Sequence, residues 1–289
     1  MKVMITGGGG QVATALAKTR PPKTDVLNVS HAELDISDRD AVMQRVAKVR
    51  PDILVNAAAY TAVDRAESEK DMAFKVNADA AGYLAATAEV TSARFIHLST
   101  DFVFDGIKSR PYKPADKTNP LSAYGASKLA GERQVAEILG ARAIILRTSW
   151  VYAGMGTNFV NTMLRLMRER QSLRVVSDQV SSPTWATSLA GAIWALIGHP
   201  GLAGIYHWTD AGVASWYDFA VAISEEAHML GLLQQEVELI PIATGDYPTP
   251  ARRPAYSVLD RSEIEHACGI RPPHWRVNLR NMLRELAHG

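Results

Sequence analysis

The segment Met1-Lys-Val-Met-Ile-Thr-Gly-Gly-Gly-Gly10-Gln-Val-Ala13 decides the fold class. Its apolar run at residues 3–6 predicts a strand, and residues 11–19 predict a helix. The glycines between them let the backbone turn sharply and approach a pyrophosphate, which a Cβ would block. The helix directs free N–H groups at the same anion. This context predicts a dinucleotide site, whereas an isolated glycine motif would predict only a flexible loop.

Short apolar runs alternate with helical patterns through the first half of the chain. Further strands are predicted at residues 26–29, 53–56, 95–99 and 143–147, and helices at residues 38–49, 70–89 and 122–139. In such an alternation, each helix returns the chain so that successive strands run parallel. The sequence therefore predicts an α/β fold with a Rossmann-type, doubly wound parallel sheet covered by helices on both faces.

The second half of the chain is less regular. Helices are predicted at residues 157–170, 185–197, 216–229 and 275–287, and short strands at residues 173–176, 204–208 and 237–240. The regular pattern fades near Trp150, but no Gly/Ser-rich linker marks a cut. We therefore predict a nucleotide-binding domain over residues 1–150 and a smaller α/β substrate-binding lobe over residues 151–289, interleaved with the first.

The composition excludes several classes of protein. The 31 Lys and Arg residues nearly balance the 30 Asp and Glu residues, so the chain lacks the basic excess of a nucleic-acid binder. The lone Cys268 cannot form an internal disulfide. The apolar run at residues 185–197 is shorter than the ~20 residues that span a bilayer. We expect a cytoplasmic protein that binds neither nucleic acid nor membranes.

Two registers of the glycine loop fit a dinucleotide, Gly8-x-Gly10-x-x-Ala13 and the wider Gly7-x-x-Gly10-x-x-Ala13. Further along, Asp35-Ile36 opens a loop at the carboxyl edge of the predicted sheet, where an acceptor would bind the adenine amino group. The alternative role, capping of the next helix, fits Ser37 or Asp38 better.

The end of the strand at residues 26–29 bears on the kind of dinucleotide. Proteins that bind NAD hold the ribose 2′-OH with an acid after this strand, but here the strand ends Val29-Ser30-His31. An uncharged end leaves space for the 2′-phosphate of NADPH, with Arg20 or Lys23 assisting. In the alternative, Asn28 or Ser30 binds an unphosphorylated ribose, as NADH requires. The sequence leaves both interpretations open.

Tyr124 and Lys128 share one face of the helix predicted at residues 122–139, since they are four residues apart. A phenol has a reference pKa near ~10, and a nearby ammonium lowers it. Tyr124 would then donate a proton to an alkoxide as hydride reaches a carbonyl carbon. Such a pair alone is more often a solvated helix face, but the glycine loop favours the catalytic interpretation.

Two other strand ends carry candidate residues. Ser99, Thr100 and Asp101 end the strand at residues 95–99, and Thr100 is placed to hydrogen-bond the reacting oxygen. Asp101 would accept from a substrate hydroxyl. The alternative for all three is turn capping. After residues 53–56, the small residues of Asn56-Ala-Ala-Ala-Tyr60 let a flat ligand pass close to the backbone; alternatively, they form a tightly packed junction.

Several longer motifs identify a resemblance that runs nearly from end to end. These motifs are Val55-Asn-Ala-Ala-Ala-Tyr-Thr-Ala-Val-Asp64, Leu98-Ser-Thr-Asp-Phe-Val-Phe-Asp-Gly106, Tyr124-Gly-Ala-Ser-Lys-Leu-Ala-Gly-Glu132, Arg147-Thr-Ser-Trp-Val-Tyr152, Asp178-Gln179 and Tyr247-Pro-Thr-Pro-Ala-Arg-Arg-Pro254. They resemble the extended short-chain dehydrogenase/reductase family and, within it, the dTDP-4-dehydrorhamnose reductases. The resemblance implies hydride transfer from NADPH, or NADH, to C4 of a dTDP-4-keto-6-deoxy sugar, yielding dTDP-L-rhamnose.

The resemblance also implies roles for individual residues. The implied catalytic triad is Thr100, Tyr124 and Lys128. The implied substrate contacts are Thr100, Asp101, Tyr124 and Trp150 at the sugar, and Asn158 and Arg253 near the diphosphate. The implied cofactor contacts are Gly7, Gly10, Gln11, Val12, Asp35, Ile36, Ala57, Ala58, Ala59, Tyr60, Ser99, Tyr124 and Lys128. Taken alone, Arg253 would be surface charge and Trp150 would be core.

One departure from the family concerns metal. Some family dimers are bridged by Mg²⁺ through three Glu residues. Here the helix segments Val12-Ala-Thr-Ala-Leu16 and Trp185-Ala-Thr-Ser-Leu189 contain no acid, and only Glu285 matches. One carboxylate cannot supply the oxygen ligands that Mg²⁺ requires. We therefore expect no Mg²⁺ bridge, and a monomer or a weak, metal-free homodimer.

Two other functions are consistent with these motifs. One is another nucleotide-sugar 4-ketoreductase or an epimerase of the same fold, and an epimerase would retain its NAD tightly. The other is a non-catalytic regulatory subunit, such as the accessory subunit of methionine adenosyltransferase. The presence of Thr100, Tyr124 and Lys128 argues against lost chemistry, because a pure binder needs no matched phenol and ammonium.

Overall fold

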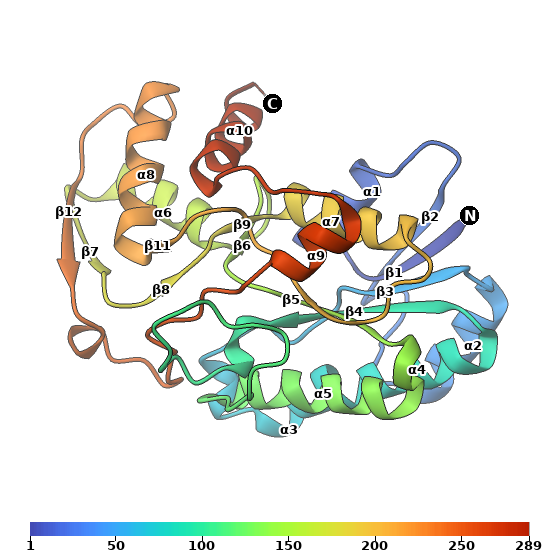
Figure 1. Ribbon diagram of the computed structural model, residues 1–289. Coiled ribbons are helices and arrows are strands. Elements are labelled where there is room, and N and C mark those ends of the chain that lie inside the picture. The colour runs from blue at the N-terminus through green and yellow to red at the C-terminus, as the bar shows by residue number, and fades with distance from the viewer. Residues whose placement is uncertain (289) are drawn as a thin grey trace.

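The computed structural model describes residues 1–288, with a six-stranded parallel sheet at its centre (Figure 1). The strands of this sheet are β1 (Lys2–Gly8), β2 (Asp25–Ser30), β3 (Ile53–Asn56), β4 (Arg94–Thr100), β5 (Ile144–Thr148) and β10 (Gly204–His207). Their order is β10-β5-β4-β3-β1-β2. The chain leaves β1 on one side for β2 and continues on the other side at β3, which places the topological switch between β1 and β3. The predicted α/β doubly wound fold is confirmed.

Helices cover both faces of the sheet (Figure 1). One face packs against α1 (Gln11–Lys18) and α7 (Ala186–Gly198), and the other against α2 (Arg39–Val49), α4 (Ala80–Thr91) and α5 (Ala123–Leu139). Because side chains alternate along a strand, Val3 and Ile5 join the first core and Met4 joins the second. Burial on both faces explains why the strands read as continuous apolar runs.

A second group of elements builds the smaller lobe. It contains α6 (Phe159–Glu169), α8 (Trp216–Met229), α10 (Trp275–His288) and the parallel pair β7 (Ser172–Val176) and β12 (Glu238–Ile242). Phe219 of α8, Met163 of α6 and Leu283 of α10 meet in its core. Two short pairs, β6 (Val151–Tyr152) with β9 (Thr184–Trp185) and β8 (Val180–Ser181) with β11 (Ala214–Ser215), form separate two-stranded sheets.

The two parts of the chain interleave. β10 pairs with β5 and completes the central sheet, and α7 packs against α1. The short helix α9 (Ser262–Cys268), which the sequence did not predict, also adds Ile264 to the core beneath α1 and α7. Segments that follow residue 150 therefore complete the first unit. The division into residues 1–150 and 151–289 stays a prediction, with these segments crossing it.

The helix predicted at residues 70–89 is interrupted. It comprises α3 (Lys70–Phe74), a π-helical turn (Lys75–Asp79) and α4. Asn77 in this turn is buried, and its side chain bonds both the N–H and the carbonyl of Tyr60 as well as the Ser127 hydroxyl. The widened turn thus links α4 to α5 and to the loop after β3. Such π-helical turns are frequent at functional sites.

Within residues 1–288, no helix is long and apolar enough to cross a membrane.

Candidate active site

The glycine loop lies between the ends of β2 and β3. Gly7 has φ +82°, and a Cβ there would lie 2.8 Å from the backbone of Ala57 and Ala58. A Cβ on Gly8 would lie 2.6 Å from the Val29 carbonyl carbon. Gly10 donates its N–H to the Gly7 carbonyl at 3.0 Å, which closes the turn. The close packing explains why Gly7 and Gly8 are glycines, and it fits both registers of the dinucleotide motif.

The start of α1 fits a pyrophosphate. Gly10 is the N-cap of α1 and, as a glycine, offers no side chain to the first helical N–H groups. These include the N–H groups of Gln11 and Val12. Uncapped N–H groups and the positive end of the helix dipole are the features that bind phosphate oxygens. The residues present therefore fit a dinucleotide at the carboxyl edge of the sheet.

The predicted adenine contacts lie at the next loop. The Asp35 carboxylate accepts the Ser37 N–H at 2.9 Å, and Asp38 caps α2 by accepting the Ala41 N–H at 3.0 Å. Asp35 also lines an open pocket of about 620 Å³ together with Lys75. The adjacent Ile36 is 5% exposed and belongs to the core below α2. Asp38, not Asp35, thus caps the helix, and Asp35 stays a predicted cofactor contact.

The loop after β3 is fixed by Asn56. Its Oδ1 accepts the N–H of Ala58 at 3.2 Å and the hydroxyl of Thr6 at 2.8 Å. Its Nδ2 lies 3.1 Å from His97 Nδ1, so a polar row crosses β1, β3 and β4 within the sheet. This row was not predicted; its signal in the sequence is one polar residue in each of three apolar strands, at positions that pair in register. Ala57, Ala59 and Tyr60 continue this loop and are half-buried.

Tyr124 and Lys128 lie in the first turns of α5. Ser122 caps the helix by accepting the Gly125 N–H at 3.2 Å. Lys128 is 3% exposed, and its Nζ donates to the Leu98 carbonyl of β4 at 2.6 Å. Burial lowers the pKa of Lys128 to about 8, although the charge of Glu132 opposes this. The structure thus brings Tyr124 and Lys128 to the end of β4.

The pKa of Tyr124 shifts in the direction opposite to the sequence expectation. Burial raises the pKa of Tyr124 to about 12, the Thr100 hydroxyl beside it acts against this rise, and the Asp101 carboxylate adds to it. The expected lowering is therefore wrong for this structure, because burial of the phenol outweighs the other influences on its pKa. A raised pKa keeps the phenol protonated but makes it a weaker acid, so the shift does not by itself favour proton donation.

Thr100 and Asp101 form a buried polar corner after β4. Thr100 donates its hydroxyl to Asp101 Oδ1 at 3.0 Å, and Ser257 donates to Asp101 Oδ2 at 2.5 Å. Burial raises the pKa of Asp101 to about 6 against these hydrogen bonds. In the described part of the chain, the Ser99 hydroxyl is buried without a partner. The contacts predicted for these three residues stay predictions, and Ser257 is an unpredicted member of the corner.

Trp150 adopts a backbone conformation that is rare for a bulky residue. Its φ is +46°, in the left-handed region, which costs of the order of 1–3 kcal/mol. Its ring stacks on Trp216 with centroids 3.4 Å apart and planes 7° apart. Trp216 in turn donates its indole N–H to Gln179 at 3.2 Å. Strained residues gather at functional sites, so the geometry favours the predicted role of Trp150 over simple core packing.

Asn158 and Arg253, the two residues predicted near the diphosphate, form hydrogen bonds with other residues of the chain. Asn158 caps α6 through the Asn161 N–H at 3.0 Å and donates to Gln11 Oε1 at 2.9 Å, which places it beside the glycine loop. Arg253 forms a two-pronged ion pair with Asp64, at 3.0 and 2.8 Å. The Arg253 hydrogen bonds lower the pKa of Asp64. Arg253 is thus oriented by Asp64 in this structure, and its phosphate contact stays a prediction.

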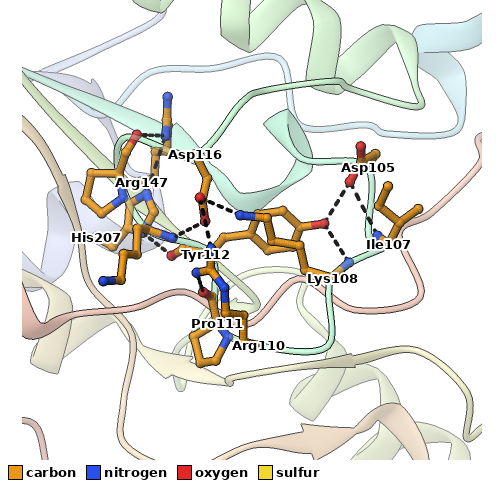
Figure 2. A network of polar contacts seen from close by, with 11 residues as sticks. Asp105, Ile107, Lys108, Arg110, Pro111, Tyr112, Asp116, Arg147 and His207 are labelled. Atoms are coloured by element: carbon orange, nitrogen blue, oxygen red, sulfur yellow. Dashed lines mark hydrogen bonds and ion pairs between the residues drawn. The ribbon is translucent and has the colours of Figure 1, made fainter.

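A buried network fixes α5 and the loop that precedes it. Arg147 of β5 donates to both carboxylate oxygens of Glu132 in α5, at 2.8 and 2.7 Å, one helical turn after Lys128. Figure 2 shows Arg147 next to His207, and Tyr112 bonded to Asp105. Arg147 also donates to the Pro114 carbonyl at 3.1 Å. Burial and Arg147 lower the pKa of His207 to about 3, so its ring is neutral.

The glycine loop at the end of β1, together with a half-buried tyrosine and a buried lysine beside the end of β4, defines a short-chain dehydrogenase/reductase. Residues 1–288 match the family model described as the RmlD substrate binding domain. The chain therefore belongs to this family, that of the dTDP-4-dehydrorhamnose reductases.

Individual relatives support the same assignment. The chain is 42% identical to a dTDP-4-dehydrorhamnose reductase of Aggregatibacter actinomycetemcomitans, with 97% of this chain and 98% of the relative covered. It is 43% identical to that of Burkholderia thailandensis, with 99% of both covered. The crystal structure of the Bacillus anthracis reductase in complex with NADP has a TM-score of 0.93 at 36% identity, covering 98% of this chain and 99% of that one.

Proposed function

We propose that this protein reduces the C4 ketone of dTDP-4-dehydro-6-deoxy-L-mannose to give dTDP-L-rhamnose. The observation that carries the proposal is the convergence of Thr100, Tyr124 and Lys128 at the end of β4, at the edge where the glycine loop opens. The names of the relatives at 42% and 43% identity support the choice of substrate.

The cofactor is proposed to be NADPH, with NADH as the alternative. The Bacillus anthracis relative in complex with NADP supports this choice. Gly7, Gly10 and the N–H groups of Gln11 and Val12 would hold the pyrophosphate at the start of α1. When bound, the dihydronicotinamide supplies the hydride for C4.

The chain's own groups complete the reduction by moving one proton. Tyr124 Oη donates its proton to the C4 oxygen, so that the ketone gains one hydride and one proton and becomes an alcohol. The Lys128 ammonium has two N–H groups beyond the one held by the Leu98 carbonyl, and its charge stabilises the phenolate left behind. The Thr100 hydroxyl, which donates to Asp101 Oδ1 in this structure, would turn to donate a hydrogen bond to the same oxygen as charge develops on it.

An assay of the purified protein tests this function. The 4-keto-6-deoxy-L-sugar is supplied on dTDP and on UDP, with NADPH and with NADH, and cofactor oxidation and product are followed together. We expect turnover with the dTDP sugar and a product with the configuration of dTDP-L-rhamnose. Protein that carries stoichiometric NAD and interconverts sugars without net oxidation is instead an epimerase, and a protein without turnover is a regulatory subunit.

We also propose that no Mg²⁺ bridges two copies of this chain, which is then a monomer or a weak, metal-free homodimer. The reason lies in the sequence, where Glu285 of α10 is the single acid at the three helix positions concerned. The sedimentation coefficient is expected to be the same with EDTA as with added Mg²⁺. A dimer that dissociates in EDTA and reforms with Mg²⁺ would contradict this prediction.

A further inference from the structure

Gln179 belongs to the Asp178-Gln179 motif, to which the proposed reaction gives no role, yet its side chain is buried. Its Oε1 accepts the indole N–H of Trp216 at 3.2 Å, and its Nε2 donates to the Thr244 hydroxyl at 3.0 Å. An indole N–H can only donate, so a single orientation of the side-chain amide serves both partners. Gln179 thus joins two segments that are distant in sequence.

The first segment leads to the sugar end of the proposed site. The Trp216 ring lies between the Trp150 ring, on which it stacks with centroids 3.4 Å apart, and the Phe159 ring at 4.6 Å. Trp150 has φ +46°, so contacts with the rest of the structure must hold it in place against the preference of its backbone. Because the Gln179 amide binds the indole N–H, it fixes the ring on which Trp150 stacks.

The second segment is the loop that carries Arg253, called here the Arg253 loop (residues 244–255). At its start, the first residue donates its N–H to both Asp178 carboxylate oxygens, at 2.9 and 3.0 Å, and its hydroxyl to one of them at 2.6 Å. At its end, the Ala255 carbonyl accepts the Val180 N–H at 2.8 Å. Both ends of the loop therefore contact the same short stretch of chain, which has Gln179 at its centre.

We propose that Gln179 is a positioning residue for the substrate, because it fixes Trp150, through Trp216, and the Arg253 loop relative to each other. The inference rests on the proposed function, in which Trp150 contacts the sugar and Arg253 lies near the diphosphate. One amide then sets the spacing between these two subsites before the substrate binds. The side-chain hydrogen bonds of Gln179 go to these two segments and not to the groups at the end of β4, so it acts on substrate binding rather than on proton transfer.

Gln179→Met tests the proposal, because Met has a similar length but makes neither hydrogen bond. We expect the KM of the keto sugar and the Kd of dTDP-L-rhamnose to rise roughly tenfold, as for the loss of about one net hydrogen bond. We expect kcat to change less than about threefold and the Kd of NADPH to stay at the wild-type value. A purely structural defect would instead lower the fraction of active protein, and therefore kcat, at an unchanged KM.

Two further variants separate the two links. Trp216→Phe keeps a ring against Trp150 but removes the N–H, and Thr244→Val removes the hydroxyl that Gln179 binds. Trp216→Phe is expected to weaken binding of dTDP-L-rhamnose but not of dTDP, which lacks the sugar. Thr244→Val is expected to weaken binding of both ligands by a similar factor, because both carry the diphosphate.

The matched control is Gln134→Met, which removes a half-buried amide of α5 that donates to Asp79 at 3.4 Å. Its KM and dissociation constants should equal those of the wild type. Calorimetric titration with dTDP-L-rhamnose and with dTDP, steady-state kinetics and the unfolding midpoint are measured for every variant.

The role of Gln179 is overturned, and the proposed function stands, if the wild type turns over the keto sugar while Gln179→Met keeps the wild-type KM. An equal rise of KM in Gln134→Met has the same meaning. If Gln179→Met does not fold, the other two variants decide, and wild-type affinities in both Trp216→Phe and Thr244→Val overturn the inference. A wild type that neither reduces the keto sugar nor binds dTDP-L-rhamnose refutes the proposed function and this inference together.

Discussion

Tyr124→Phe is expected to lower kcat by about 10²–10⁴-fold while leaving cofactor affinity near the wild-type value. The phenol hydroxyl is the proton donor in the proposed reaction, and with a pKa of about 12 it is protonated at neutral pH, as an ordinary phenol also is. Phe fills the same space and preserves the edge-to-face contact with Phe102, whose ring centroid lies 5.7 Å away. Steady-state kinetics with the keto sugar, combined with cofactor titration, separates the loss of chemistry from a loss of binding.

A second tyrosine provides the control for this measurement. Tyr83 in α4 is half-buried and packs against the core on the far side of the sheet from α1. Tyr83→Phe removes a phenol hydroxyl from a helix that borders α5 without touching the proposed site, so kcat should change less than about twofold. Full activity of Tyr124→Phe would remove Tyr124 from the reaction.

Arg147→Met is expected to lower the free energy of unfolding by about 3–5 kcal/mol. Arg147 and Glu132 are only 2% and 3% exposed, so the variant leaves a carboxylate buried without its partner. Urea denaturation followed by circular dichroism measures the loss as a shift of the midpoint at constant slope. The double variant Arg147→Met/Glu132→Met should recover most of this loss, because it removes both buried charges.

An exposed ion pair provides the comparison. Arg165 and Glu169 of α6 are 60% and 52% exposed and pair at 3.0 Å. Arg165→Met should therefore change the free energy of unfolding by about 0–1 kcal/mol. Equal losses for Arg147→Met and Arg165→Met would show that burial does not make the Arg147–Glu132 pair important for stability.

The spacing of apolar residues predicted the elements whose conformation depends on residues that are close in sequence. The strand Ile53–Asn56 and the helix Trp216–Met229 have the predicted bounds, because their apolar residues follow the period of a buried strand and of a half-buried helix. The helix predicted at residues 70–89 instead contains a π-helical turn around Asn77. That turn depends on Tyr60 and Ser127, which are distant in sequence, so no local pattern could reveal it.

The site was predictable as a set of residue types but not in its electrostatics. The motifs placed Tyr124 and Lys128 together, and the structure brings both to the end of β4. The direction of the Tyr124 pKa shift depends on burial, which spacing along a helix does not report. Glu33 reaches the end of β2 through the four-residue turn Ser30–Glu33, and a rule that inspects only the strand end overlooks it.

The main-chain acceptor of the Lys128 ammonium affects which substitutions β4 can tolerate. The ammonium is held by the main-chain carbonyl of Leu98, and a carbonyl is present whatever amino acid is encoded there. Mutations at position 98 can alter packing, yet they cannot delete this acceptor. Substitutions of side chains along β4 therefore leave the acceptor of the lysine in place.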